Sequence, residues 1–171
     1  MKLNWAFSCG AVLAVALWGC SPSGYAASGE TPKVKDTGLI YFAGQKNGEP
    51  DGSNTCSIKI ESGTHKFVKM DDCKNDDYYY YRFENAPSAA LITLYAENDC
   101  RDGSDDNDWY FTLRTYVGSL SNKYRKISDV ENLSAGDIVS LGVMYEKGKK
   151  RKGDVDGKLS CVVIDYDLGK S

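Results

Sequence analysis

The sequence predicts an all-β domain in which two Greek-key motifs form one antiparallel β-sandwich, stapled by disulfides and with at most one short helix. Three observations predict this fold class. Apolar residues alternate over short runs, while a helical period of 3.6 residues is nearly absent. Gly, Asn, Asp and Ser separate these runs at the spacing typical of sandwiches and barrels. Finally, four cysteines fall inside the region with this pattern.

The individual elements follow from these runs in order. A loop rich in Gly, Asn, Pro and Asp is expected from Gly44 to Asn54, after the first strand. One short helix is expected at Ser128-Asp129-Val130-Glu131, because this stretch has the Ser-x-x-Glu spacing of a capping box. Strands are expected where apolar, aromatic and β-branched residues concentrate: 39–42, 58–70 with a break at 62–63, 78–83, 90–95, 109–116, 138–145 and 159–166.

The N-terminus has the pattern of an export signal. An uncharged, mostly apolar run covers residues 5–19, which is too short for a bilayer-spanning helix of about 20 residues. Leu17-Trp18-Gly19-Cys20 resembles a bacterial lipoprotein cleavage site, in which Cys20 is acylated and becomes the new N-terminus. Ordinary cleavage after Ala26, a small residue, is the alternative.

The lipoprotein interpretation divides the chain into a signal peptide (1–20), a flexible spacer (21–37) and a β-sandwich domain (38–171). The spacer is assigned because Ser, Gly, Pro and Lys dominate it. Ser21, rather than Asp, follows Cys20, as in enterobacterial lipoproteins of the outer membrane. We therefore expect a periplasm-facing lipoprotein, held at the membrane by its lipid and anchored in the outer membrane.

Charge and cysteine content narrow the function classes. Without the signal peptide, 20 basic and 24 acidic residues remain, a net charge of −4, so nucleic acid is not an expected partner. Four cysteines in an exported domain favour two disulfides over free thiols, and four cysteines allow three pairings. The preferred pairing is Cys56–Cys73 with Cys100–Cys161, since the first two flank one apparent hairpin. A zinc site is not expected, because CxxC is absent and His65 is the single histidine.

The domain contains an internal repeat. Strand 39–42 and its glycine-rich turn correspond to strand 91–95 and the turn that reaches Gly103. The acidic turn 73–77, which enters one strand, corresponds to 154–160, which enters another. Each half therefore runs strand, turn, central hairpin, acidic turn and strand.

This repeat resembles the two-motif βγ-crystallin domain, across roughly Gly38 to Asp167. In that family each Greek key opens with an aromatic strand and a glycine turn, and closes with an acidic pair, two residues and Ser or Thr. Asp156-Gly157-Lys158-Leu159-Ser160 keeps this spacing, with Gly157 in place of the second acidic residue. Asn75-Asp76-Asp77-Tyr78-Tyr79 keeps the acids but has Tyr79 at the hydroxyl position. The resemblance implies the Greek-key fold and offers calcium binding as one activity.

The densest acidic stretch, residues 97–108, has three interpretations. Calcium requires six to eight oxygen ligands in a flexible turn, although the spacing here is not that of an EF-hand. The stretch is otherwise a solvated loop between strands or an acidic face for a basic partner. No metal ligands are assigned and no cofactor is expected. As partner contacts we predict its aspartates Asp102, Asp105, Asp106 and Asp108.

Two further stretches are candidate contact surfaces. The basic run 147–153 is expected as a hairpin tip, either solvated or attracting an acidic partner through Lys149, Lys150 and Arg151. Tyr78–Tyr81 is expected on a strand, where successive rings face opposite sides. Of this run, Tyr79 and Tyr81 with the adjacent Arg82 have the chemistry of an interface hot spot. The alternative is a cross-strand aromatic ladder that stabilises the sheet.

The sequence does not predict an enzyme. Thr64-His65-Lys66 falls in a polar hairpin, and a Gly-x-Ser-x-Gly nucleophile motif is absent from the sequence. Carboxylates are plentiful, but no specific spacing pairs two of them for glycoside chemistry.

We therefore expect a binding protein that neutralises a toxin or lytic enzyme by direct protein–protein contact. Immunity lipoproteins of type VI secretion effectors, including the lipase immunity type, look similar in size and organisation. A secreted phospholipase effector is accordingly one expected target. The alternative is a calcium-binding structural or envelope-stress domain of the βγ-crystallin type.

Overall fold

The structure is a computed structural model, and it describes residues 38–166. The described residues form strands and two 3-10 helices in the following order: β1 (Leu39–Lys46), β2 (Glu49–Lys59), β3 (Gly63–Lys66), η1 (Phe67–Lys69), β4 (Tyr80–Glu84), β5 (Leu91–Tyr95), β6 (Trp109–Thr115), β7 (Arg125–Lys126), η2 (Ile127–Val130), β8 (Ile138–Ser140), β9 (Val143–Lys150) and β10 (Cys161–Asp165). The described residues contain no helix that could serve as a transmembrane span. The expected signal peptide and spacer lie outside the described residues.

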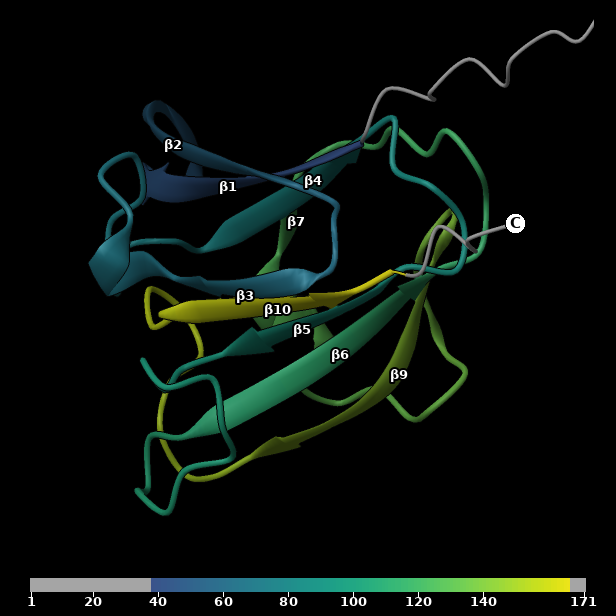
Figure 1. Cartoon of the computed structure of the whole chain (residues 1–171). Helices are drawn as coiled ribbons and strands as arrows, with labels where there is room; N and C mark the ends of the chain where they lie inside the picture. Colours follow the sequence, from purple (N-terminus) through teal and green to yellow (C-terminus); the bar gives the residue numbers. More distant parts are fainter. Residues whose placement is uncertain (1–37, 167–171) are drawn as a thin grey trace, which may run out of the picture. The chain divides into compact units, whose positions relative to one another are not determined.

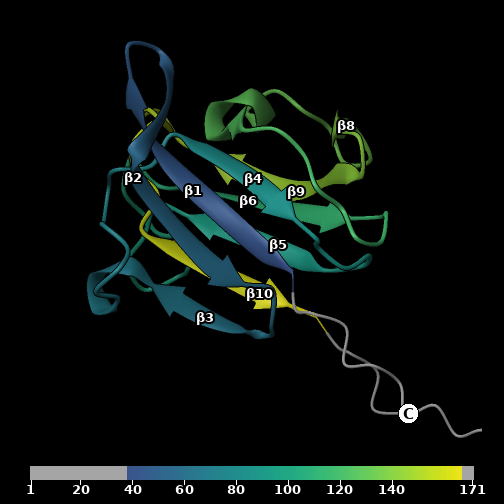
Figure 2. The same cartoon turned by 90° about the horizontal axis from the view of Figure 1, so that it is seen from above.

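Two antiparallel sheets pack face to face, which confirms the predicted all-β sandwich (Figures 1 and 2). One sheet has the strand order β2-β1-β4-β7, and the other has the order β3-β10-β5-β6-β9-β8. Both orders contain strands that are distant in sequence, as Greek-key connections require.

The two motifs exchange one strand each, which gives the domain an internal pseudo-symmetry. Strands β1, β2 and β4 share a sheet, and β5, β6 and β10 share the other; β3 of the first motif pairs with β10, while β7 of the second pairs with β4. Equivalent hydrogen bonds follow these strands. The Phe67 amide donates to the Ser160 carbonyl (3.0 Å), and the Ile127 amide donates to the Tyr79 carbonyl (2.8 Å). The hairpin β8-β9 is the addition to the second motif.

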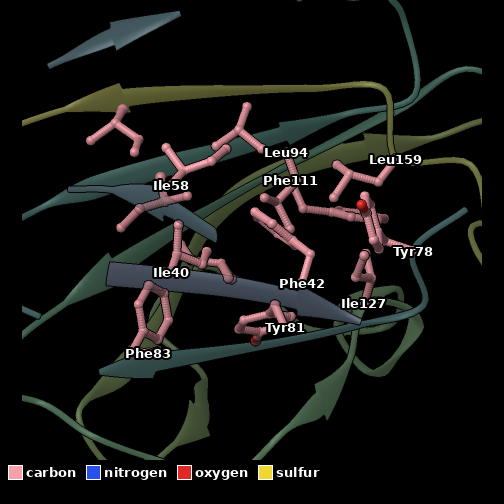
Figure 3. Close-up of a cluster of buried hydrophobic side chains, with 14 of the residues drawn as sticks. Ile40, Phe42, Ile58, Tyr78, Tyr81, Phe83, Leu94, Phe111, Ile127 and Leu159 are labelled. Carbon is pink, nitrogen blue, oxygen red and sulfur yellow. The ribbon is translucent and has the colours of Figure 1, made fainter. Parts of the chain in front are cut away.

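The core lies between the sheets. Figure 3 shows side chains of β1 and β4 pointing toward those of β5 and β6 across this space. Fully burying each large apolar side chain contributes about 1.5–3 kcal/mol. The buried set includes Ile40, Phe42, Tyr81 and Phe83 from the first sheet, and Ile92, Leu94, Phe111 and Leu113 from the second.

Two disulfides hold the domain, in the pairing preferred from the sequence. Cys56 of β2 bonds to Cys73, which lies in the segment before β4. Cys100, in the loop after β5, bonds to Cys161 at the start of β10. The second bridge therefore ties the acidic loop directly to the central part of a sheet.

The prediction of one continuous strand over 138–145 is wrong, because two strands, β8 and β9, cover this stretch. The chain turns at Leu141-Gly142, where Gly142 has φ +84°, and this conformation favours glycine. The result is the hairpin β8-β9 instead of one strand. The basic run is also not a hairpin tip, because Lys147–Lys150 continue β9 and pair with β6.

The predicted loop 44–54 is largely a hairpin. Asn47 and Gly48 adopt φ of 53° and 84°, as a two-residue Asn-Gly hairpin turn requires, and β2 begins at Glu49. The predicted helix near 128–131 is a single 3-10 turn, η2. Its N-cap is Lys126 with no side-chain capping bond, so the expected capping box does not form.

Candidate functional site

The acidic and basic stretches pack against each other at one end of the sandwich. We call residues 97–108 and 147–153 together the charged loop end. Lys149 forms an ion pair with Asp102 (2.8 Å), and Lys152 forms one with Asp106 (3.3 Å). The Arg151 guanidinium donates to the Gly103 carbonyl (3.0 Å). The two opposite charge runs thus form one mixed surface instead of two separate patches.

Backbone contacts and a disulfide hold this surface in place. The Arg151 amide donates to the Asp108 carbonyl (3.1 Å), and the amides of Lys152 and Gly153 donate to the Asp106 carbonyl (2.8 and 2.9 Å). Cys100 is bonded to Cys161 of β10. A surface that is ordered before binding loses less conformational entropy on association.

Three carboxylates of the acidic loop converge, one of them exposed, one half-buried and one buried. The side chains of Glu97, Asp105 and Asp108 place carboxylate oxygens within 4.8 Å of one another. Asp108 is buried, and it accepts the backbone N–H of Asp105 (2.5 Å). Desolvation, the hydrogen bond with Asp108 and its negative charge raise the pKa of Glu97. A cation could be held by such oxygens, but the hydrogen bonds within the cluster already account for their placement.

Two tyrosines extend the charged loop end onto the outer face of the second sheet. The rings of Tyr95 and Tyr110 stack, with centroids 5.9 Å apart and planes at 29°. They line a shallow depression of about 260 Å³ together with Asp102 and Lys147. Both rings are half-buried. Desolvation, followed by the proximity of Tyr110 and Asp102, raises the pKa of the Tyr95 hydroxyl.

A β-bulge determines which basic side chains reach this face. The register between β6 and β9 shifts between Thr112 and Leu113, because Glu146 is an extra residue in β9. Beyond the shift, Lys147 and Lys149 lie opposite Thr112 and Tyr110. Gly148 lies under Phe111, where an added Cβ would approach the ring to 2.6 Å.

The tyrosine run is divided differently from the prediction. Tyr81 is fully buried, and burial raises its pKa, so this residue is excluded from a contact surface. Tyr78 precedes β4 and is also buried, so its ring is not part of the surface. Tyr80 is 6 % exposed and donates its hydroxyl to the Gly48 carbonyl (2.5 Å). The run therefore supplies core packing and a contact with the β1-β2 hairpin, and β4 begins two residues later than predicted.

Arg82 lies on the outer face of the first sheet, away from the charged loop end. Its guanidinium stands 3.9 Å from the ring centroid of Tyr41 and 5.5 Å from that of Tyr124. It also forms an ion pair with Glu84 (2.9 Å). These contacts satisfy Arg82 within the domain.

Tyr79 and Lys150 lie near a second depression. This depression, of about 410 Å³, is lined by Tyr79, Ser128, Glu131, Asp154, Val155 and Asp156. Lys150 forms an ion pair with Glu131. The Tyr79 ring lies against Gly157, where an added Cβ would come within 2.8 Å of it. The predicted contacts therefore fall into separate groups, and only Asp102 and Lys149 join the stacked tyrosines.

His65 has no catalytic arrangement among the described residues. Its Nε2 is buried without a hydrogen-bond partner, and desolvation lowers the pKa of the imidazole. A general base needs a hydrogen-bonded nucleophile, which His65 lacks in this structure.

Sequence reasoning did not single out Tyr95 and Tyr110 as a site. The signal was present, because Tyr110 and Thr112 alternate with the buried Trp109 and Phe111 along one strand. Their partner strand could only be identified from the sheet order, which places β5 beside β6. No family model matches this chain, and no curated protein or solved structure matches it at a significant level.

Proposed function

We propose that this domain is a binding module that neutralises a protein toxin or lytic enzyme in the periplasm through its charged loop end. The observation that carries the proposal is the stacked pair Tyr95–Tyr110 beside the ion pair Lys149–Asp102. Tyrosines with charged neighbours, on a surface ordered before binding, have the composition of interface hot spots. A secreted phospholipase effector remains the proposed example of a target.

The location of the protein in the cell forms part of the proposal. A lipid on Cys20 and a spacer over 21–37 would hold the domain at the outer membrane, where it would intercept an incoming protein. The two disulfides support an oxidising compartment. The mass of the mature N-terminal peptide distinguishes acylated Cys20 from cleavage after Ala26.

The binding experiment uses isothermal calorimetry with the purified product of each adjacent gene, tested as the candidate toxin. Double replacement Tyr95→Ala/Tyr110→Ala should raise the dissociation constant at least about 30-fold, the effect of losing one hot spot of 2 kcal/mol. Tyr41→Ala is the matched control, because Tyr41 is also a half-buried tyrosine on an outer sheet face. Equal affinity of the wild type and the double variant would refute the assignment of this surface.

Calcium binding is the second candidate function, and one specific contact favours it. The Ser160 hydroxyl donates to Asp76 Oδ1 (2.7 Å), so the hydroxyl of one motif meets the acid of the other. Asn75 Oδ1 and Asp156 Oδ1, at equivalent positions of the two motifs, are buried without hydrogen-bond partners. Such oxygens fit a hard cation. The strand exchange of β3 and β7 supports the crystallin-type resemblance behind this candidate.

The equivalent second position fits calcium poorly. There the Tyr79 ring stands where the resemblance expects a hydroxyl, and Gly157 stands where it expects the second acid. At most one of the two crystallin-type sites is therefore proposed. Calcium titration by calorimetry tests it: binding heat that disappears in Asp76→Ala supports the site, and an absence of heat at millimolar calcium removes it. The exposed Asp71→Ala is the control.

A further inference from the structure

One end of the domain carries no charged side chain along three segments. These segments, 85–90, 116–122 and 138–143, contain 19 residues without a single Lys, Arg, Asp or Glu, although 26 % of the whole chain is charged. We call them together the uncharged end. The absence of charged residues over three adjoining segments sets this end apart from the acidic and basic stretches.

Contacts join the three segments into one surface. Ala86 and Leu120 exchange backbone hydrogen bonds (2.9 and 2.8 Å), which links the first segment to the second. The Tyr116 amide donates to the Gly142 carbonyl (3.0 Å), which links the second to the third. Gly142 also packs on Leu120, since an added Cβ would come within 2.5 Å of its side chain.

Large apolar side chains project from this surface. Leu141, at the turn between β8 and β9, is 83 % exposed, and Ile138, Tyr116 and Val117 are each at least 42 % exposed. Of the five large apolar side chains that are exposed in the described part of the chain, only Val68 lies elsewhere, in η1. Exposed apolar side chains gathered at one end of a domain make that end a candidate contact surface.

The uncharged end is also where the chain enters the domain. Gly38 packs on Ala86 and Asn85 so closely that an added Cβ would lie 2.5 Å from the Asn85 carbonyl oxygen. Figure 1 shows β1 beginning at the end where β6 ends and β9 begins, opposite the charged loop end. Seventeen residues separate Gly38 from Cys20. As a flexible linker they would have a root-mean-square length of about 23 Å.

We propose that the uncharged end rests on the lipid surface to which the N-terminus is anchored. This inference relies on the proposed lipid tether, not on the identity of the protein target. Tyrosine and aliphatic side chains without charges suit the boundary between headgroups and acyl chains, where Leu141 would insert first. The charged loop end would then face away from the membrane, toward an incoming partner.

The test is tryptophan quenching by brominated lipids. Full-length protein, processed and purified from bacterial membranes, is reconstituted in vesicles of phosphatidylethanolamine and phosphatidylglycerol with brominated acyl chains. The emission of Leu141→Trp above the wild-type background should be lower than in vesicles of the same lipids without bromine, as expected for a side chain at the acyl boundary. Val68→Trp is the matched control, because Val68 is an exposed apolar residue that lies outside the uncharged end; its emission should not change.

Each result has a distinct meaning. If the brominated lipids reduce the emission equally at both positions, in protein that sediments with the vesicles, the proposal is overturned while the tether stays intact. Protein that fails to sediment also overturns it, and the mass of the N-terminal peptide then reports whether the lipid is missing. Leu141→Glu should abolish the contact with lipid and leave the affinity for the toxin unchanged. Loss of that affinity would assign the uncharged end to a protein partner instead, whereas failure of the Tyr95→Ala/Tyr110→Ala experiment concerns only the proposed function.

Discussion

At the scale of single residues, Gly148 is a position where the charged loop end requires the absence of a side chain. It lies where β9 crosses Phe111, and an added Cβ would approach the Tyr145 hydroxyl to 2.5 Å and the Phe111 ring to 2.6 Å. Any side chain must therefore displace the strand that carries Lys147 and Lys149. The glycine in the basic run is a packing requirement of β9 and not a sign of a turn.

Replacement of Gly148 by Ala should lower the free energy of unfolding by about 1–3 kcal/mol, the usual cost of overpacking a core. Gly52→Ala is the control, since nothing lies within 4 Å of an added Cβ there. It should stay within about 0.5 kcal/mol of the wild type. Urea unfolding measures both, and equal stability of the two variants would contradict the packing described for β9.

Glu97 makes the free energy of unfolding depend on pH, in a direction that follows from its raised pKa. Its pKa is raised above the ordinary value of 4.5 by desolvation and by Asp108, so the folded state binds this proton more tightly than the unfolded state. The stabilising contribution of Glu97 is fully present below pH 4.5 and is lost as the pH rises through the raised pKa. At neutral pH the ionised Glu97 carboxylate therefore lowers the free energy of unfolding relative to the protonated form.

We expect Glu97→Gln to raise the free energy of unfolding at neutral pH and to have little effect below pH 4.5, because the amide cannot ionise beside Asp108. Urea unfolding in chelator-containing buffer, at the two pH values, measures this difference. A variant less stable than the wild type at neutral pH would mean that the carboxylate is needed in its charged form.

At the scale of elements, the two disulfides constrain loops of different length. Cys100 and Cys161 are separated by 61 residues, and Cys56 and Cys73 by 17. In the chain-entropy picture, removing the longer bridge costs about 4 kcal/mol and removing the shorter one about 3 kcal/mol. The longer bridge also anchors the acidic loop.

Paired Cys→Ala replacements should follow this order in urea unfolding. In addition, loss of Cys100–Cys161 should increase hydrogen exchange across residues 97–108, while loss of Cys56–Cys73 should leave that loop unchanged. If the acidic loop exchanges equally in both double variants, the disulfide does not order the charged loop end.

Much of the sandwich could be predicted from local sequence patterns, and the errors of that prediction also have local causes. Alternation along 109–116 identified β6, since its residues really do face opposite sides. The prediction of which rings of Tyr78–Tyr81 face outward was wrong in part, because four identical side chains show no alternation that would identify the buried face. The division of 138–145 into two strands depends on Gly142 in a left-handed conformation, which an apolar run conceals.

The site could be predicted only in part, because it depends on sheet order. Asp102 and Lys149 were chosen as charged loop residues, but their ion pair joins positions 47 residues apart. Tyr95 and Tyr110 belong to neighbouring strands whose pairing no short pattern specifies. Tyr81, predicted as a contact, is buried because it lies with Phe83 on the face of β4 that packs into the core.

At the scale of the whole molecule, the domain has two chemically different ends. The charged loop end has internally paired charges and adjoins the stacked tyrosines Tyr95 and Tyr110. The uncharged end presents Leu141 and its neighbours beside the entry of the chain. In the proposed arrangement, one end meets the membrane and the other meets the target. The strands between them provide a rigid, disulfide-held separation.

Hydrogen exchange, measured on the protein alone and in complex with a toxin that it binds, tests the central claim most directly. We expect slower exchange on binding across 95–110 and 147–153, with 116–122 and 138–143 unchanged. Slower exchange confined to 116–122 and 138–143, or no change anywhere in a complex that forms, would contradict binding through the charged loop end.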